Sequence, residues 1–362
     1  MRGLDGRQRL VLVAAVEQAA LAGLRRHYAA RDLREVSVPV IVGITGACEN
    51  VATLFGVAND SRAHLTQTGQ LALEHVLSGA GVCCVTRSFR TDLVDSRHLH
   101  EFTLVEEEFP CTHQAVGLSR EDYDEDRMFD ALLQEMEAAL RCVLAAALDD
   151  VPDEARALGA DPERLRRALD RPFGRITYTD AVRLLDADGA VGRTAWGDDL
   201  RQPQEARLIE LLAGRGGERM PAFVTHFPVD IKFFNMRASR SAPGVVLSAD
   251  LLLPDAGEAM GGAVRDHEYE ALRERLVSST MFRHIHERGL GDLADFAPYL
   301  SLVEERRTPP HAGYGLGLER ALQYVLGEPD IRRVSVPYLL SEAMGFDRVI
   351  AAMQAGAKSP GF

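Results

Sequence analysis

The chain has 362 residues, of which 46% are hydrophobic and 26% charged, a composition that excludes disordered, collagen-like and coiled-coil proteins. Its formal net charge of −13 argues against nonspecific nucleic-acid binding, which depends on lysine and arginine. No apolar run approaches the ~20 residues of a membrane span, no secretory signal is recognisable, and five scattered cysteines without CxxC spacing predict free thiols, so we expect a cytoplasmic protein with no membrane partner.

The first third of the chain alternates between helical and strand patterns. Apolar residues recur at helical spacing over residues 7–30. The β-branched stretch 36–42 predicts an edge strand, because Pro39 cannot donate a backbone hydrogen bond to a neighbouring strand. A short helix and two strands are expected next, at residues 69–77, 81–90 and 98–109.

The remaining elements follow in a similar order. Residues 120–147 carry an apolar helical stripe, whereas the charged stretch 149–171 predicts a solvated excursion on the surface. Then come strands between residues 220 and 262, a helix over 266–288, and a glycine-rich junction between a strand and a helix at 312–320. Because the strands cluster in neighbouring pairs with helices between them, the sequence predicts an α+β fold with an antiparallel sheet.

Three side chains of these elements indicate a nucleotide site. Alternate residues of a strand point the same way, so one face of the second strand would carry His98, His100, Phe102, Leu104 and Glu106. A base between Phe102 and Arg320 would be stacked on both sides, with Arg90 on the phosphate nearest the sugar. Each residue taken singly is more often an ordinary surface residue, and the Gly-x-Gly-x-Gly spacing before Arg320 lacks the Lys-Ser/Thr of a P-loop.

Two carboxylates in an apolar region indicate a possible metal site. A turn at residues 254–257 would bring Asp250 and Glu258 together on neighbouring strands, where they could bind Mg²⁺ on nucleotide phosphates. An aspartate in a turn and a glutamate paired with an arginine explain the same residues equally well. Lys232 could reach this site or cover an edge strand.

Taken together, these segments resemble the catalytic domain of class II aminoacyl-tRNA synthetases, closest to the asparaginyl/aspartyl branch. The three signatures of that class occur in order, in the helix and strand ending at Pro39, in residues 88–102 and in residues 313–320. Residues 66–71, 196–200 and 250–262 resemble asparaginyl members specifically. The resemblance covers the chain from about residue 7 to residue 338.

The resemblance implies roles for individual residues. Catalytic roles are implied for Arg90 and Arg320, and Mg²⁺ binding for Asp250 and Glu258. Contacts to ATP are implied for Arg90, Asp92, His98, Phe102, Glu258, Gly317 and Arg320. Contacts to the amino acid are implied for Glu49, Gln70, Glu74, Glu106 and Arg265. Aspartyl members place a lysine at the position of Leu73, whereas asparaginyl members place a glutamate at that of Glu74, so the pocket is more similar to an asparagine pocket.

The chain also departs from the family pattern. The first signature begins within ten residues of Met1, so we expect one catalytic domain over residues 1–362, with a mostly helical insertion over about 118–218 and no N-terminal OB-fold that reads an anticodon. Asp92 replaces the usual glutamate, and Ala263-Val264 replace the usual Ser-Gln before Arg265. The resemblance also implies a homodimer formed through the N-terminal helix and the Pro39 strand.

These observations lead to a first hypothesis, an AMP-forming ligase that adenylates an aspartate- or asparagine-like acid with ATP and Mg²⁺. The acyl group would pass to ammonia or another non-tRNA amine, with tRNA an unlikely partner because of the acidic charge and the missing anticodon domain. A minimal asparagine–tRNA ligase is the alternative. A non-catalytic protein that binds an amino acid or a nucleotide is a further one.

Overall fold

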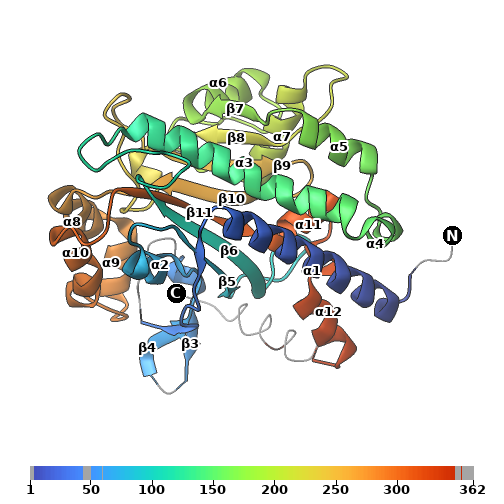
Figure 1. Cartoon of the computed structure of the whole chain (residues 1–362), viewed down its shortest axis with the longest axis horizontal. Helices are drawn as coiled ribbons and strands as arrows, with labels where there is room; N and C mark the ends of the chain where they lie inside the picture. Colours follow the sequence, from blue (N-terminus) through green and yellow to red (C-terminus); the bar gives the residue numbers. More distant parts are fainter. Residues whose placement is uncertain (1–3, 44–49, 59, 347–351, 353–362) are drawn as a thin grey trace.

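The computed structural model describes residues 4–43, 50–58, 60–346 and 352. Its centre is an eight-stranded sheet in the order β1-β5-β6-β11-β10-β9-β8-β7 (Figure 1). In this order the strands are β1 (Arg34–Glu35), β5 (Val82–Phe89), β6 (Glu101–Pro110), β11 (His311–Gly317), β10 (Gly257–Val264), β9 (Ser248–Leu253), β8 (Ala222–Thr225) and β7 (Gly174–Thr177). Only the outer pairs β1–β5 and β7–β8 are parallel, which confirms the predicted α+β fold with an antiparallel sheet.

Two long helices cover one face of this sheet. Figure 1 shows α1 (Gly6–Ala30) and α3 (Glu125–Asp149) side by side across the strands, and α11 (Leu318–Leu326) packs on the same core. Val105 and Phe109 of β6 face these helices and are completely buried. Because strand side chains alternate, Phe102, Leu104 and Glu106 of β6 point to the opposite face, which the long helices leave uncovered.

Smaller units surround the sheet. One core contains α2 (Gln70–Val76), α8 (Tyr269–Ser278), α9 (Thr280–Glu287), η3 (Leu293–Phe296) and α10 (Ala297–Glu304), and another joins α6 (Tyr178–Asp188) and α7 (Gln202–Ala213) to β8 and β9. The remaining elements are β2 (Ile41–Val42), β3 (Phe55–Val57) and β4 (Asp60–Leu65) of a three-stranded sheet, α4 (Pro152–Leu158), α5 (Pro162–Asp170), α12 (Val336–Ala343), η1 (Val51–Thr53), η2 (Val229–Ile231) and η4 (Ile331–Arg333).

The stretch 36–42 does not form the predicted edge strand. Its last two residues form β2, which belongs to a different sheet from the preceding strand β1, and Pro39 lies in neither strand. Val36 and Val38 instead pack against the small core around Leu73. Proline has no N–H to donate, and at this position the chain leaves one sheet for the other.

Two further predictions are wrong in detail. The helix expected over 266–288 is divided into α8 and α9, because Ser279 adopts an extended conformation and its side chain caps α9 by accepting a hydrogen bond from the backbone N–H of Phe282. The stretch 149–171 is not a solvated excursion. It forms α4 and α5, whose apolar residues Leu158 and Leu165 are buried in the main core.

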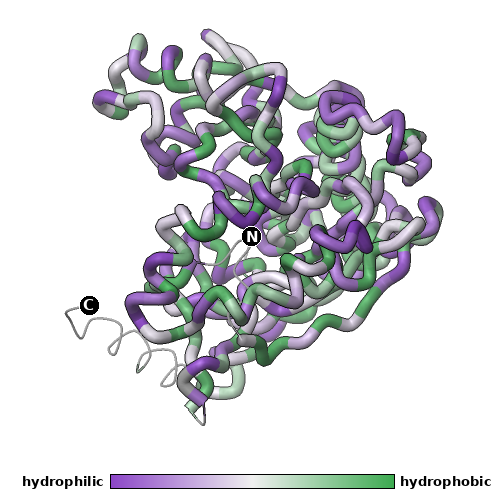
Figure 2. Tube along the Cα trace, turned by 90° about the vertical axis from the view of Figure 1, so that its left-hand side faces the viewer, coloured by the Kyte–Doolittle hydropathy of each residue, from purple (hydrophilic) through white to green (hydrophobic). Residues whose placement is uncertain are grey.

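Hydrophilic and hydrophobic residues are mixed along most of the chain (Figure 2). Within the described ranges, every helix is too short or too polar to cross a membrane. Of the cysteines that the structure describes, Cys83, Cys84 and Cys111 are buried thiols and Cys142 is partly exposed. Cys48 lies outside the described residues.

Candidate active site

A cavity of about 460 Å³ lies on the face of the sheet that α1 and α3 leave uncovered. Its floor is formed by β6, β10 and β11, and alternate positions of β11 that face it are glycines. A side chain at Gly315 would contact Leu104 and Glu106, whereas Tyr314 and Leu316 pack into the core on the other side. The glycine spacing therefore leaves room for a ligand against the strand.

The three residues expected to hold a nucleotide all line this cavity. The guanidinium carbon of Arg90 lies 5.7 Å from the centre of the Phe102 ring, within the range of a cation–π contact. Arg320 comes from the first turn of α11, and its Nη1 donates a hydrogen bond to the backbone carbonyl of Glu258. Burial lowers the pKa of Arg320, but an arginine in a protein keeps its charge. The arrangement offers two fixed positive charges and an aromatic ring to one ligand.

Residues of the loop before β6 and the last residue of β11 line the cavity together with Arg90 and Phe102. Asp92, His98 and Gly317 line the cavity, and His98 Nδ1 lies 3.0 Å from Asp95 Oδ1. His100 does not share the face of Phe102, because β6 begins at Glu101 and strand alternation does not extend to earlier residues. His100 Nδ1 instead donates to the backbone carbonyl of Arg90 at 3.1 Å, and its ring borders a second, mostly apolar cavity of about 430 Å³.

The opposite end of the cavity contains a buried carboxylate, Glu106. It accepts hydrogen bonds from the Thr68 hydroxyl and, at 2.6 Å, from the backbone N–H of Gly69. Burial raises the pKa of Glu106, and these hydrogen bonds oppose the rise. Gln70 lines the cavity beside it, whereas Glu49, which was expected here, lies outside the described residues.

A buried ionic cluster lies behind Gln70. Arg265 lines the cavity, and its Nη2 is 2.6 Å from Glu108 Oε1. His311 Nε2 is 3.2 Å from Glu74 Oε2 and 3.8 Å from Glu108 Oε2. Glu74 does not line the cavity. It accepts a hydrogen bond of 2.7 Å from Gln70 Nε2, so it can act on a ligand only through its neighbours.

The charges in this cluster depend on one another. Burial disfavours ionisation of Glu74, but His311, Arg265 and Gln70 outweigh it and lower the pKa of Glu74. Burial likewise disfavours the imidazolium of His311, yet Glu74 and Glu108 raise its pKa overall. Glu74, Glu108 and His311 have atoms within 4.8 Å of one another, as metal ligands do, but Arg265 already supplies a cation to Glu108.

The two carboxylates expected to bind a metal lie on adjacent antiparallel strands. A Cβ atom at Gly261 would be 3.2 Å from Glu258 Oε1 and 3.7 Å from Asp250 Oδ1, so both side chains converge above this glycine. Burial raises the pKa of Asp250 to about 7, although Lys232 opposes this. Mg²⁺ takes one or two carboxylates and keeps several waters, so the donor set fits this ion.

Lys232 reaches the site, one of the two alternatives that the sequence left open, whereas Arg97 and Glu108 were given no role there. Lys232 Nζ lies 2.6 Å from Asp250 Oδ2, and Arg97 of the cavity wall pairs with Glu205 of α7 at 3.2 Å. Glu108 was overlooked as well. A signal for it existed, because residues 106–108 are three consecutive glutamates within an apolar strand, and buried carboxylates require partners.

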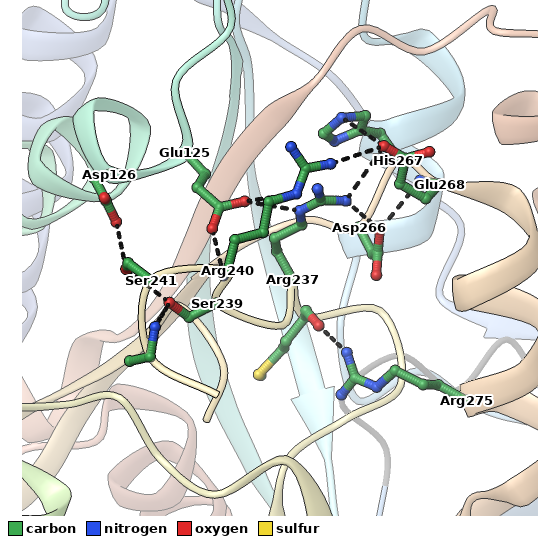
Figure 3. A network of polar contacts seen from close by, with 12 residues as sticks. Glu125, Asp126, Arg237, Ser239, Arg240, Ser241, Asp266, His267, Glu268 and Arg275 are labelled. Carbon is green, nitrogen blue, oxygen red and sulfur yellow. Dashed lines mark hydrogen bonds and ion pairs between the residues drawn. The ribbon is translucent and has the colours of Figure 1, made fainter. Parts of the chain in front are cut away.

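A polar network supports the segment next to Arg265. Figure 3 shows Arg237 between Glu125 and Asp266, at 3.2 Å and 3.0 Å. The Arg237 side chain is only 5% exposed, so both charge pairs are shielded from water. Arg275 donates to the backbone carbonyl of Met236 in the same network. These contacts tie α3, α8 and the residues that flank Arg265 into one support.

The chain is similar in sequence to known proteins over most of its length. Residues 4–337 match the family model described as tRNA synthetases class II (D, K and N). The chain is 33% identical over 335 residues to an asparagine–tRNA ligase of Pelotomaculum thermopropionicum, covering 91% of this chain and 67% of the relative. It is 33% identical over 315 residues to that of Symbiobacterium thermophilum, covering 84% and 64%.

A solved structure is similar over the same length. The asparaginyl-tRNA synthetase from Pyrococcus horikoshii, complexed with asparaginyl-adenylate, superimposes with a TM-score of 0.74 at 29% identity, covering 91% of this chain and 68% of that one. The chain thus spans about two thirds of the length of the relatives that it matches.

These relatives contradict the expectation that tRNA is an unlikely partner. Proteins named for tRNA as their acceptor match 84–91% of this chain. The expectation was drawn in part from the net charge, which is a sum over the whole surface and does not exclude a local basic region that binds phosphates.

Proposed function

The chain belongs to the class II tRNA synthetases of the D, K and N group, and from this membership we propose that it activates asparagine with ATP and transfers it to tRNA. The observation that carries the proposal is the convergence of Arg90, Phe102 and Arg320 on one cavity that ends at a second set of charged groups around Arg265. The first set suits a nucleotide, and the second suits a small polar amino acid.

Adenylation needs charge stabilisation more than it needs an enzyme nucleophile. A carboxylate oxygen of asparagine attacks the α-phosphorus of ATP, an acyl–phosphate bond forms, and pyrophosphate leaves. Arg90 would offset the negative charge that builds on the α-phosphate, while Phe102 and Arg320 would stack on the two faces of the adenine. Asp250 and Glu258 would hold Mg²⁺, which supplies positive charge to the phosphates when bound.

The amino-acid end favours a neutral side chain. Glu106 would accept hydrogen bonds from the substrate ammonium, and Arg265 would donate to the side-chain carbonyl. Among the described residues, this end of the cavity contains three buried carboxylates, Glu74, Glu106 and Glu108, against Arg265 and His311. An aspartate side chain would add a further negative charge to this surplus, whereas the asparagine amide adds none.

The acceptor is the second part of the proposal. In transfer to tRNA, a hydroxyl of the terminal ribose attacks the acyl carbon of the adenylate, and AMP leaves. The relatives are named for this acceptor, and they support it over ammonia or another free amine. Asp92, Arg97 and His98 of the loop before β6 line the cavity together with Arg90 and Phe102.

The test is a charging assay with purified protein, ATP, radiolabelled asparagine and total bacterial tRNA. Asparagine should become attached to tRNA, and the Arg320→Ala variant should lose the reaction. The control Arg183→Ala, at a side chain of α6 that is 75% exposed, should retain it. Formation of the adenylate without any labelled tRNA, at several tRNA concentrations and salt strengths, would contradict the assignment of the acceptor.

A further inference from the structure

Lys232 pairs with Asp250, one of the two carboxylates that would bind the metal of the nucleotide. It follows η2 and enters the cavity beside β9, where its Nζ lies 2.9 Å and 2.6 Å from the two oxygens of Asp250. The side chains of Lys232 and Asp250 are only 16% and 12% exposed. The pair is therefore a largely buried ion pair with both carboxylate oxygens engaged.

Aromatic and acidic side chains surround the Lys232 ammonium. Nζ lies 3.9 Å from the centre of the Phe227 ring, which offers a cation–π contact but no proton acceptor. Asp199 and Glu258 line the same cavity as Lys232 and Asp250, so several carboxylates lie around the ammonium. The arginines of the cavity have other partners, since Arg97 pairs with Glu205 at 3.2 Å and Arg320 donates to the backbone carbonyl of Glu258. Lys232 is the cation in direct contact with Asp250.

We propose that Lys232 is a resident cation that competes with a divalent metal for Asp250, so that the metal enters the site with ATP and not before it. The inference rests on the proposed function only in taking ATP as the ligand of the cavity. A divalent ion bound to Asp250 and Glu258 would lie close to the ammonium, and like charges at such short range repel each other even in a water-like medium.

Phosphates change this balance. Four negative charges of ATP at the same end of the cavity would attract both cations and offset their repulsion. Lys232 would then be a positioning residue that keeps Asp250 oriented toward the phosphates while the metal completes the site. The expected signature is strong mutual enhancement between ATP and the metal, and weak binding of either the free metal or metal-free ATP.

The experiment measures Mn²⁺ binding to the ATP-free protein by electron paramagnetic resonance of the unbound ion at pH 8. The variants are Lys232→Met and Lys232→Gln, which remove the charge, and Lys232→Arg, which keeps it. The first two should bind Mn²⁺ about tenfold more tightly than the wild type, and Lys232→Arg should match the wild type. Adding Asp250→Asn to Lys232→Gln should remove the gain.

Folding is checked separately, by circular dichroism and thermal unfolding of each variant. The glutamine variant retains a side-chain donor to Asp250, so it keeps the test available where methionine does not fold. An unchanged or weaker Mn²⁺ affinity in a folded charge-removing variant would overturn the proposal. Because the readout is metal binding without ATP, its outcome is independent of whether the protein charges tRNA.

Discussion

The Arg265 guanidinium lies 2.6 Å from the Glu108 carboxylate at the inner end of the cavity, and both side chains are almost completely buried. Arg265 is the cation of the cavity wall that the family resemblance assigns to the substrate side chain, and Glu108 offsets its charge. A neutral carbonyl of the substrate can still accept a hydrogen bond from such an arginine. A substrate carboxylate is attracted less strongly by an arginine that is paired with a glutamate than by an unpaired arginine. The charge balance of this buried pair therefore affects whether the cavity prefers asparagine or aspartate.

Glu108→Gln should therefore relax the preference for asparagine over aspartate. Removing the charge leaves Arg265 less compensated and lowers the repulsion felt by an aspartate side chain. We expect the ratio of kcat/KM for asparagine to that for aspartate, in pyrophosphate exchange, to fall by about tenfold, which corresponds to about 1.4 kcal/mol. The neighbouring Glu107→Gln is the matched control, because Glu107 faces the opposite side of the sheet. A ratio that stays constant in Glu108→Gln would contradict this role.

Glu107 should make the stability of the protein depend on pH. It is buried against α1, where it accepts a hydrogen bond of 2.5 Å from the Tyr314 hydroxyl and lies 3.4 Å from Arg31. Burial raises the pKa of Glu107 to about 6, above its ordinary value of 4.5, with Arg31 and Tyr314 opposing the rise. The folded protein then binds the extra proton more strongly, and this group's contribution to stability falls as the pH rises from 4.5 through 6.

The substitution Glu107→Gln removes the ionisable carboxyl and therefore the loss of stability at higher pH. The glutamine can still accept a hydrogen bond from the Tyr314 hydroxyl. Its free energy of unfolding should exceed that of the wild type by about 1–2 kcal/mol at pH 8, with the difference vanishing near pH 4.5. Urea unfolding at the two pH values measures this. A variant that is less stable than the wild type at pH 8 would show that the Arg31 contact outweighs the cost of burying the charge.

Gly313 should tolerate no side chain. A Cβ atom there would lie closer to the Glu108 carboxylate than van der Waals contact allows, and that carboxylate is held by Arg265 and His311. Gly313→Ala should cost about 1–3 kcal/mol of stability, as overpacking does elsewhere, and should raise the KM for asparagine. Gly56→Ala, on β3 with nothing within 4 Å of the new atom, is the control and should be neutral in both measurements. Equal effects of the two substitutions would exclude the steric explanation.

How much of this could be anticipated from the sequence differs from residue to residue. Strand alternation places Phe102, Leu104 and Glu106 on one face, and the structure agrees because β6 is regular from Glu101 onward. The same rule fails for His100, one residue before the strand. Local patterns describe a regular element well, but they do not specify its first residue.

Contacts between distant segments were beyond the reach of local patterns. Lys232 and Asp250 are 18 positions apart and come from different elements, and their pairing depends on how η2 packs beside β9. Glu74 is similar to the amide-binding glutamate of asparaginyl members, yet it lies behind Gln70 and pairs with His311. The residue types were recognised, but which neighbour each would face is set by tertiary packing.

The most direct test of the central claim, an ATP-dependent activation of asparagine in this cavity, is amino-acid-dependent exchange of radiolabelled pyrophosphate into ATP. The wild-type protein should catalyse exchange with asparagine and far less with aspartate, and Arg320→Ala should reduce the rate at least about a hundredfold through loss of adenine stacking and charge. A folded wild-type protein that supports no exchange with asparagine at saturating ATP and Mg²⁺ would contradict the account.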